Sequence, residues 1–517
     1  MTPTVLIVGI DVATMTLALM LELAGVDYLL LEKSDSVPSV AGGISLHPTV
    51  LPLLEQLSLR DDLLFFSQPL EQVLVLDSDM EYITTYDWSD RRIRYGAWSR
   101  FMTRPEYCSV ILEKLTESRV LFNKDIASIT TIDCAEDERA DRAEGLLPLD
   151  SRQDSVLDID ITMEKGEARG GVTVECMDGS SYTGHLIVAD VESGIERTFD
   201  KKAAFAGSGG QQDFVAQGAH AKGAATTRTN DTPAPREVHY HVSGITEALD
   251  PQRIPLLKED TTQLRLVLEE RSSLSWWVAT LVDHRIAWQV TQRIRLSDKT
   301  AAAWAEADWP LEDEEAAKAS VISQMSQAMM CPLGGTMAQI AQWTSPSEIS
   351  CTRWDDRTAP TRVNPTSASS SRLQLLGEAC RKVVPILGQA ADESILDALS
   401  LAEAIVALPS TRLVDIRDAF ERYRKERTSR REAAIRESHD LDQLLNAKGA
   451  MQKAYRTVKL NYTPKCTQER RMDEKYSYRP QANFLEPVPD YGQIQPVLHN
   501  HNHNRNNHHY HHRSHRP

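Results

Sequence analysis

The chain has 517 residues, of which 41% are hydrophobic, and this composition is typical of a globular protein with two or three domains. Its formal net charge of -17 argues against nucleic acid as a partner and against charge-driven docking on an anionic membrane, because both need a basic face. No run approaches the roughly 20 uninterrupted apolar residues of a membrane span. The seven cysteines form no C-x-x-C pair and no signal peptide precedes the first strand, so we expect a reduced, cytoplasmic protein.

The N-terminus has the pattern of a strand, a helix and a second strand. Residues 4–9, TVLIVG, predict a short buried strand. The next segment carries apolar side chains at helical spacing and ends at Gly25, a suitable residue just past a helix. Residues 27–32, DYLLLE, predict a second buried strand. In such a unit the two strands are expected to be parallel, with a right-handed crossover.

The turn after the first strand, Gly9-Ile10-Asp11-Val12-Ala13-Thr14, partly matches a dinucleotide-binding turn. Gly9 supplies the first glycine, and Glu32 stands where an acidic residue holds the ribose hydroxyls. Asp11 and Thr14 occupy the positions of the second and third glycines. The spacing alone leaves two interpretations open: a dinucleotide site, or an ordinary βαβ unit that binds no nucleotide.

The pattern is less regular further along the chain. Between Gln263 and Ile294, apolar and polar residues alternate and predict antiparallel strands. Three tryptophans in this region are expected to pack the sheet rather than to line a substrate cavity: Trp276, Trp277 and Trp288. Helices are predicted at residues 398–408 and 414–436. Residues 133–170 are expected to form a loop, and residues 201–236 and the His-rich tail are expected to be mobile because of their composition.

Several blocks together resemble the FAD-dependent monooxygenases of the para-hydroxybenzoate-hydroxylase type, and among them the fungal group of meroterpenoid and indole-diterpene pathways. The resemblance covers most of residues 1–200 and 370–490. Its blocks are VLIVGIDVATMTLALMLELAGVDYLLLEK, AGGISLHPTVLPLLEQLSL, YGAWSRFMTRPEYCSVILEKL, HLIVADVESGIER and LLGEACRKVVPILGQAADESILDALSLAEAI, followed by a charged helix and RPQANFLEPV.

The resemblance implies an α/β fold with a Rossmann-like FAD-binding domain, an antiparallel-sheet substrate domain and C-terminal helices. The FAD-binding domain is expected to be a three-layer, mostly parallel structure assembled from residues 1–75, 100–200 and 370–410. Residues 76–99 and 235–369 are assigned to the substrate domain. A helical segment at 411–465 and an extended C-terminal segment at 466–517 complete the predicted organisation.

The same resemblance implies which residues hold the cofactor, with Arg104 at the FAD phosphates. The cofactor-binding residues it implies are Gly9, Glu32, Gly43, Arg104, Asp190, Glu378, Pro385, Gly388 and Gln389. The turn at Gly388 is also compatible with a simple helix-entry glycine. No residue is assigned to catalysis, and no metal site is assigned.

Several positions depart from the family pattern, and they gather on the flavin site. They are Asp11, Thr14, Pro38, Val191, Glu378 and Ala390. A carboxylate at Asp11 is expected to repel the FAD pyrophosphate, although Arg104 could offset part of that charge. The departures therefore predict weaker FAD binding than in relatives with an intact motif.

Two functions remain open at this level. The first is an FAD- and NADPH-dependent monooxygenase that hydroxylates or epoxidises a hydrophobic secondary metabolite, with O2 as co-substrate. The second is a flavin-free relative that binds a hydrophobic intermediate, or cyclises or isomerises it by acid–base placement. In both, the partner is a small hydrophobic molecule whose identity the sequence does not specify.

Overall fold

The computed structural model describes residues 3–38, 42–132, 170–190, 237–268, 274–295, 312–325, 329–355, 372–377, 389–445, 450–461 and 463–497. Nearly all of the predicted loop at 133–170, and the segments predicted to be mobile at 201–236 and in the His-rich tail, lie outside the described residues. Three predicted cofactor residues also lie outside them: Glu378, Pro385 and Gly388.

The predicted βαβ unit is present at the N-terminus. It consists of β1 (Thr4–Val8), α1 (Val12–Leu23) and β2 (Asp27–Leu31). The two strands are parallel, with Val5 beside Tyr28. Gly25 follows α1 with φ of 67°, a left-handed conformation that glycine adopts without the cost a Cβ imposes. The sequence interpretation of this unit is confirmed to within a residue at each end.

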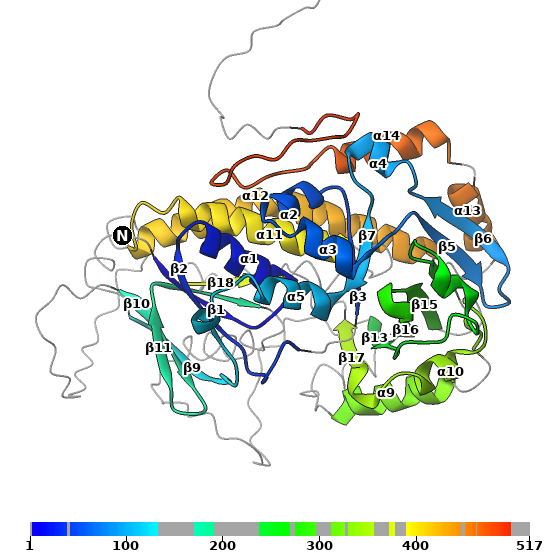
Figure 1. The fold of residues 1–517 in the computed structure, drawn as a ribbon, viewed down its shortest axis with the longest axis horizontal. Coiled ribbons are helices and arrows are strands. Elements are labelled where there is room, and N and C mark those ends of the chain that lie inside the picture. The colour runs from blue at the N-terminus through cyan, green and yellow to red at the C-terminus, as the bar shows by residue number, and fades with distance from the viewer. Residues whose placement is uncertain are drawn as a thin grey trace, which may run out of the picture.

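The βαβ unit belongs to a five-stranded parallel sheet with the order β18-β12-β1-β2-β8. Its other strands are β8 (Val120–Leu121), β12 (Leu186–Asp190) and β18 (Leu373–Leu376). A three-stranded antiparallel sheet covers one face through apolar contacts: β9 (Ile126–Ile132), β10 (Gly171–Cys176) and β11 (Ser181–Gly184). Helices α1, α5 (Arg104–Leu112) and α11 (Gln389–Val406) cover the other face, so the domain has three layers (Figure 1).

A seven-stranded sheet with the order β17-β13-β16-β15-β14-β5-β6 forms the second domain. Its strands are β5 (Gln72–Asp77), β6 (Tyr82–Asp87), β13 (Glu237–Ile245), β14 (Leu264–Leu268), β15 (Leu274–Thr280), β16 (Ile286–Arg295) and β17 (Ile349–Asp355). All neighbours are antiparallel except β5 and β14, which run parallel. Because β5 begins at Gln72, this sheet starts slightly before the predicted boundary at residue 75.

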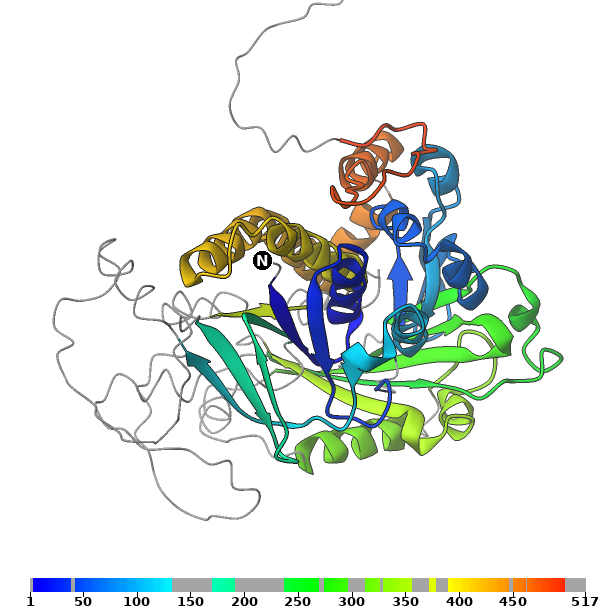
Figure 2. The same cartoon turned by 60° about the vertical axis from the view of Figure 1, so that its left-hand side comes forward.

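The two faces of this large sheet have different coverings (Figure 2). One face packs on α9 (Glu312–Met325) and α10 (Met337–Gln342), and Trp276 and Trp288 are buried there. The other face carries Trp277 and packs against Phe101 of β7 (Arg100–Thr103). All three tryptophans are at most 4% exposed, which agrees with the packing role predicted for them.

The connection between the two domains is a small sheet with the order β3-β7-β4. It combines β3 (Gly43–Leu46) and β4 (Gln68–Pro69) with β7. Short helices surround it: α2 (Leu51–Gln56), α3 (Arg60–Phe66) and α4 (Arg91–Tyr95). Since β7 runs directly into α5, the strand that packs on the large sheet also positions Arg104 at the dinucleotide turn.

The C-terminal part is helical, as predicted, and continues further than predicted. It contains α12 (Leu413–Leu445), α13 (Ala450–Asn461) and α14 (Lys465–Tyr476). Helix α14 corrects the expectation that the chain is extended from residue 466, because residues 466–476 are helical. This helix contacts α4 through the Asp473–Arg94 ion pair. Residues 477–497 then return over α2 and α4 without regular structure. No helix in the described part of the chain is long and apolar enough to cross a membrane.

Candidate dinucleotide site

The predicted turn between β1 and α1 is held by the backbone and by Glu32. Gly9 has a φ of 89°, and its N–H donates to Leu31 O at 2.9 Å. Glu32 is 3% exposed, and its two carboxylate oxygens accept from the N–H groups of Ile10 at 2.8 Å and Ser34 at 2.9 Å. The carboxylate therefore stands at the end of β2, at the position that in a dinucleotide site faces the ribose.

Thr14, which replaces the third glycine of the turn, is buried within it. The Asp11 N–H donates to Thr14 Oγ1 at 2.9 Å, and this hydroxyl in turn donates to Asp11 O at 3.2 Å. A side chain at the third position of the helix thus satisfies one of the N–H groups that a helix leaves unpaired at its start. The Thr14 hydroxyl is therefore engaged inside the turn.

The Asp11 carboxylate makes an ion pair with the Arg104 guanidinium across the turn. Asp11 is 3% exposed, whereas the Arg104 side chain keeps 19% of its surface accessible. Arg104 is fixed at the first position of α5, where its N–H donates to Gly42 O at 3.0 Å and Thr103 caps the helix. An internal anion therefore occupies the place beside Arg104 that the family resemblance assigns to a cofactor phosphate.

The predicted Asp190 comes to the same place from the end of β12. It is 4% exposed and lies beside Gly377, the residue that follows β18. A Cβ on Gly377 would stand 3.2 Å from Asp190 Oδ1 and 3.4 Å from Asp11 Oδ2, and its φ is 80°. The ends of three parallel strands thus bring Gly9, Asp190 and Gly377 together, which is where an open parallel sheet binds its ligand.

Two further predicted cofactor residues, Gly43 and Gln389, lie within the described part of the chain. Gly43 begins β3, and a Cβ there would overlap the ring of Phe101, so packing alone requires a glycine. Gln389 begins α11. The structure therefore brings together Gly9, Glu32, Arg104 and Asp190. The cofactor role of all nine predicted residues stays a prediction.

Sequence analysis missed a buried pair formed by His47 and by Asp392 at the start of α11. His47, which follows β3, is 1% exposed; its Nδ1 lies 3.0 Å from Asp392 Oδ2 and its N–H donates to Asp392 Oδ1 at 3.1 Å. Burial lowers the pKa of His47, although Asp392 opposes this, so the ring is neutral. No local pattern links two residues 345 positions apart; the only signal was a histidine directly after a buried strand.

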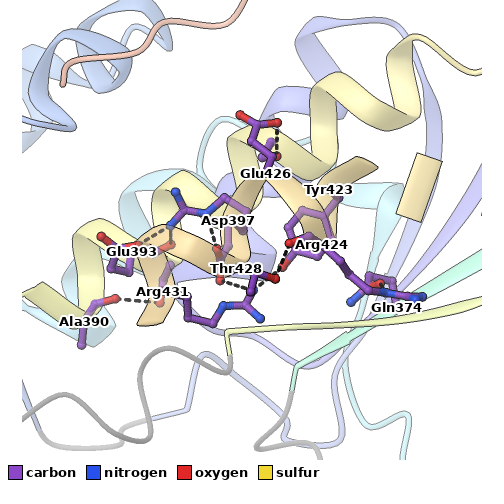
Figure 3. A network of polar contacts seen from close by, with 12 residues as sticks. Gln374, Ala390, Glu393, Asp397, Tyr423, Arg424, Glu426, Thr428 and Arg431 are labelled. Atoms are coloured by element: carbon purple, nitrogen blue, oxygen red, sulfur yellow. Dashed lines mark hydrogen bonds and ion pairs between the residues drawn. The ribbon is translucent and has the colours of Figure 1, made fainter. Parts of the chain in front are cut away.

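A network of ion pairs fixes α11 against α12, and Figure 3 shows Glu393 and Asp397 facing the arginines of α12. Arg427 Nε donates to Asp397 Oδ1 at 2.6 Å and Arg427 also pairs with Glu393, while Arg431 lies 3.1 Å from Asp397 Oδ2. Burial works to lower the pKa of Arg427, but the two carboxylates raise it overall. Arg424 extends the network to Gln374 of β18 at 3.1 Å, so it couples α11 to the strand that ends beside Asp11.

Comparison with known proteins shows which proteins this chain resembles in sequence and in fold. No family model matches the chain. The FAD-dependent monooxygenase pynG of Aspergillus niger is 25% identical over 442 residues, which cover 83% of this chain and 85% of that protein. The FAD-dependent monooxygenase ntnA of Nectria sp is 29% identical over 201 residues, 37% of this chain and only 22% of that protein. Klebsiella pneumoniae HpxO complexed with FAD and uric acid has the same fold, with a TM-score of 0.59 at 16% identity over 92% of this chain and 97% of that one.

The sequence similarity along most of the chain and the shared fold both relate it to proteins that bind FAD. The chain is therefore similar over most of its length to an FAD-dependent monooxygenase, and it shares the fold of HpxO. In the described turn, Asp11 supplies a carboxylate beside Arg104. A shallow hollow between residues 247–254 and 342–346 contains none of the predicted cofactor residues, and we assign it no role in the site. Among the described residues, no cluster of side chains could hold a metal ion.

Proposed function

We propose that this protein is an FAD- and NADPH-dependent monooxygenase that hydroxylates or epoxidises a hydrophobic secondary metabolite in fungal natural-product biosynthesis, in the cytoplasm. The observation that carries the proposal is the convergence of Gly9, Glu32, Arg104 and Asp190 at the ends of parallel strands. When bound, FAD supplies the redox chemistry: NADPH provides two electrons, one atom of O2 enters the substrate and the other leaves as water.

Different residues of the chain would hold different parts of the cofactor. Glu32 is rigidly placed by its two backbone donors and can accept from a ribose hydroxyl on a remaining lone pair. Arg104 would pair with a phosphate oxygen. The network around Asp397 keeps the first turns of α11 in place, so that the flavin end of the site is held by a helix rather than by a loop alone.

The fit of the cofactor depends on Asp11. The carboxylate beside Arg104, at the start of α1, acts as an internal stand-in for a phosphate, and it supports the assignment of this turn as an anion site. FAD can use that site if Arg104 releases Asp11 and pairs with the cofactor, a movement that its 19% exposed side chain allows. Binding therefore includes an exchange of one anion for another.

The same ion pair supports a second candidate, a flavin-free relative that binds or rearranges a hydrophobic intermediate. In that case Asp11 would neutralise Arg104 permanently. The flavin content of the purified protein distinguishes the two functions. Visible flavin absorption, or its recovery after FAD is added to a colourless preparation, supports the monooxygenase, and a colourless protein that FAD does not reconstitute contradicts it.

A further inference from the structure

A polar patch lies on the face of the seven-stranded sheet that looks toward the dinucleotide domain. On β13, Ile245 packs with Phe101 and Trp277, and alternation along the strand places Ser243 and His241 on this same face. Ser243 pairs in register with Gln289 and with Ser350, and its hydroxyl lies 3.1 Å from that of Ser350. The apolar end of the face is therefore sealed against β7, and the adjoining part is polar.

His241 is the centre of this patch, and its Nδ1 is fully engaged. Thr291 Oγ1 lies 2.9 Å from Nδ1 and Gln289 Nε2 lies 3.2 Å from it, while the same amide nitrogen donates to Thr291 Oγ1 at 3.2 Å. With the Gln289 amide oriented so that its nitrogen faces the ring, this N–H donates and Nδ1 accepts, which assigns the ring proton to Nε2. Burial, with His239 nearby, lowers the pKa of His241 to about 3, so the ring stays neutral at ordinary pH.

The Nε2–H of this tautomer has no hydrogen-bond partner within the described part of the chain, and part of the His241 side chain is accessible. Four hydroxyl-bearing residues lie on this face beside His241 and Ser243: Ser275, Thr291, Ser350 and Thr352. Arg293, further along β16 on this face, already makes a polar interaction. His241 therefore offers an uncharged donor, fixed in direction, on the sheet face that looks toward the other domain, and a domain boundary is a common place for a ligand.

We propose that His241 is a specificity-determining residue that donates from Nε2 to a neutral oxygen of the substrate. The substrate class that fits is a largely apolar molecule with a hydroxyl or carbonyl oxygen, and without a carboxylate. A single uncharged donor does not offset the cost of burying a carboxylate, whereas an apolar analogue leaves the donor unpaired. Calling the bound molecule a substrate rests on the proposed function, but its contact with His241 needs no redox step.

The test uses equilibrium dialysis of the full-length protein with 1-naphthol and its isostere 1-methylnaphthalene, with and without added FAD. We expect the wild type to prefer 1-naphthol by about 2- to 12-fold, the range of one neutral hydrogen bond. His241→Asn keeps a polar atom near the position of Nδ1 and has no donor at the position of Nε2, so this variant should lose the preference. His241→Gln reaches the position of Nε2 with an amide N–H and should keep it.

The two variants separate recognition from a purely structural role. If His241 only supported the sheet, Asn would be the milder change, because it preserves the contacts to Gln289 and Thr291. Equal affinity of the wild type for both probes, no binding of either, a preference that survives in His241→Asn, or tighter binding of 1-naphthoate than of 1-naphthol would overturn the proposal. If the protein binds no FAD but the wild type shows the preference and His241→Asn loses it, the role of His241 is supported and only the monooxygenase function is contradicted. If the protein binds FAD but the wild type shows no preference, the monooxygenase function is supported and the role of His241 is contradicted.

Discussion

Replacing Asp11 by asparagine is expected to change two properties of this protein in opposite directions. The substitution keeps the shape of the side chain and removes its charge, so Arg104 loses its internal partner. FAD should then bind more tightly, because the Asp11 carboxylate no longer competes for Arg104 and no longer repels the cofactor phosphate. The protein without FAD should become less stable, because a favourable ion pair has been removed.

The structure sets the size of both effects. Two unit charges about 4 Å apart interact by about 4 kcal/mol at an effective dielectric near 20. Since Arg104 is partly exposed and can turn toward water, we take about half of this, or 2 kcal/mol, which corresponds to roughly 30-fold in FAD affinity. The loss of stability should lie between that of a surface pair and a fully buried one, at about 1–2 kcal/mol.

Flavin-fluorescence titration of the protein gives the affinity, and urea unfolding without FAD gives the stability. The control is Arg104→Leu, alone and combined with Asp11→Asn; in that background the charge removal should tighten FAD much less, because the cation it frees is gone. Thr14 should be left unchanged, since its hydroxyl caps the turn. If Asp11→Asn binds FAD no better than the wild type, the idea that Asp11 competes with the cofactor for Arg104 is wrong.

Three further changes test the frame of the site. Asp397→Asn should cost about 3–5 kcal/mol in urea unfolding because it leaves Arg427, 1% exposed, short of a charged partner; a loss below about 1 kcal/mol would contradict the importance of the network. Gly43→Ala should cost about 1–3 kcal/mol by overlap with Phe101, and Phe101→Leu in the same chain should restore most of the loss unless another contact requires the glycine. Burial lowers the pKa of His47 below its unfolded value of about 6.5, so below that pH the unfolded chain takes up a proton that the folded protein does not, and stability should fall by up to about 1.4 kcal/mol per pH unit. Unfolding at pH 7.5 and 5.5 should show a smaller fall for His47→Gln; equal falls would mean that His47 does not titrate as described.

The sequence alone determined the parts of this protein that depend on neighbours along the chain. The run from Thr4 to Leu31 specified two buried strands, a helix and the glycine that ends it, because apolar periodicity and backbone freedom are local properties. The spacing from Gly9 to Glu32 likewise indicated an acidic group at the end of β2, and Glu32 lies there with its carboxylate on the turn. The first helix of the C-terminal part, α12, was also visible in its pattern, although its end at Leu445 was not.

Tertiary structure decided every property that depends on which distant segments meet. The sequence identified Asp11 as an added charge and Arg104 as an available cation, but only the folded chain shows that α5 brings them into contact. His47 and Asp392 are far apart in sequence, and their pairing follows from α11 packing beside β3. The free donor of His241 depends on the register of β13 and β16, which a one-residue shift would turn to the opposite face. Local periodicity carries no information on such contacts, because they arise from how whole elements pack.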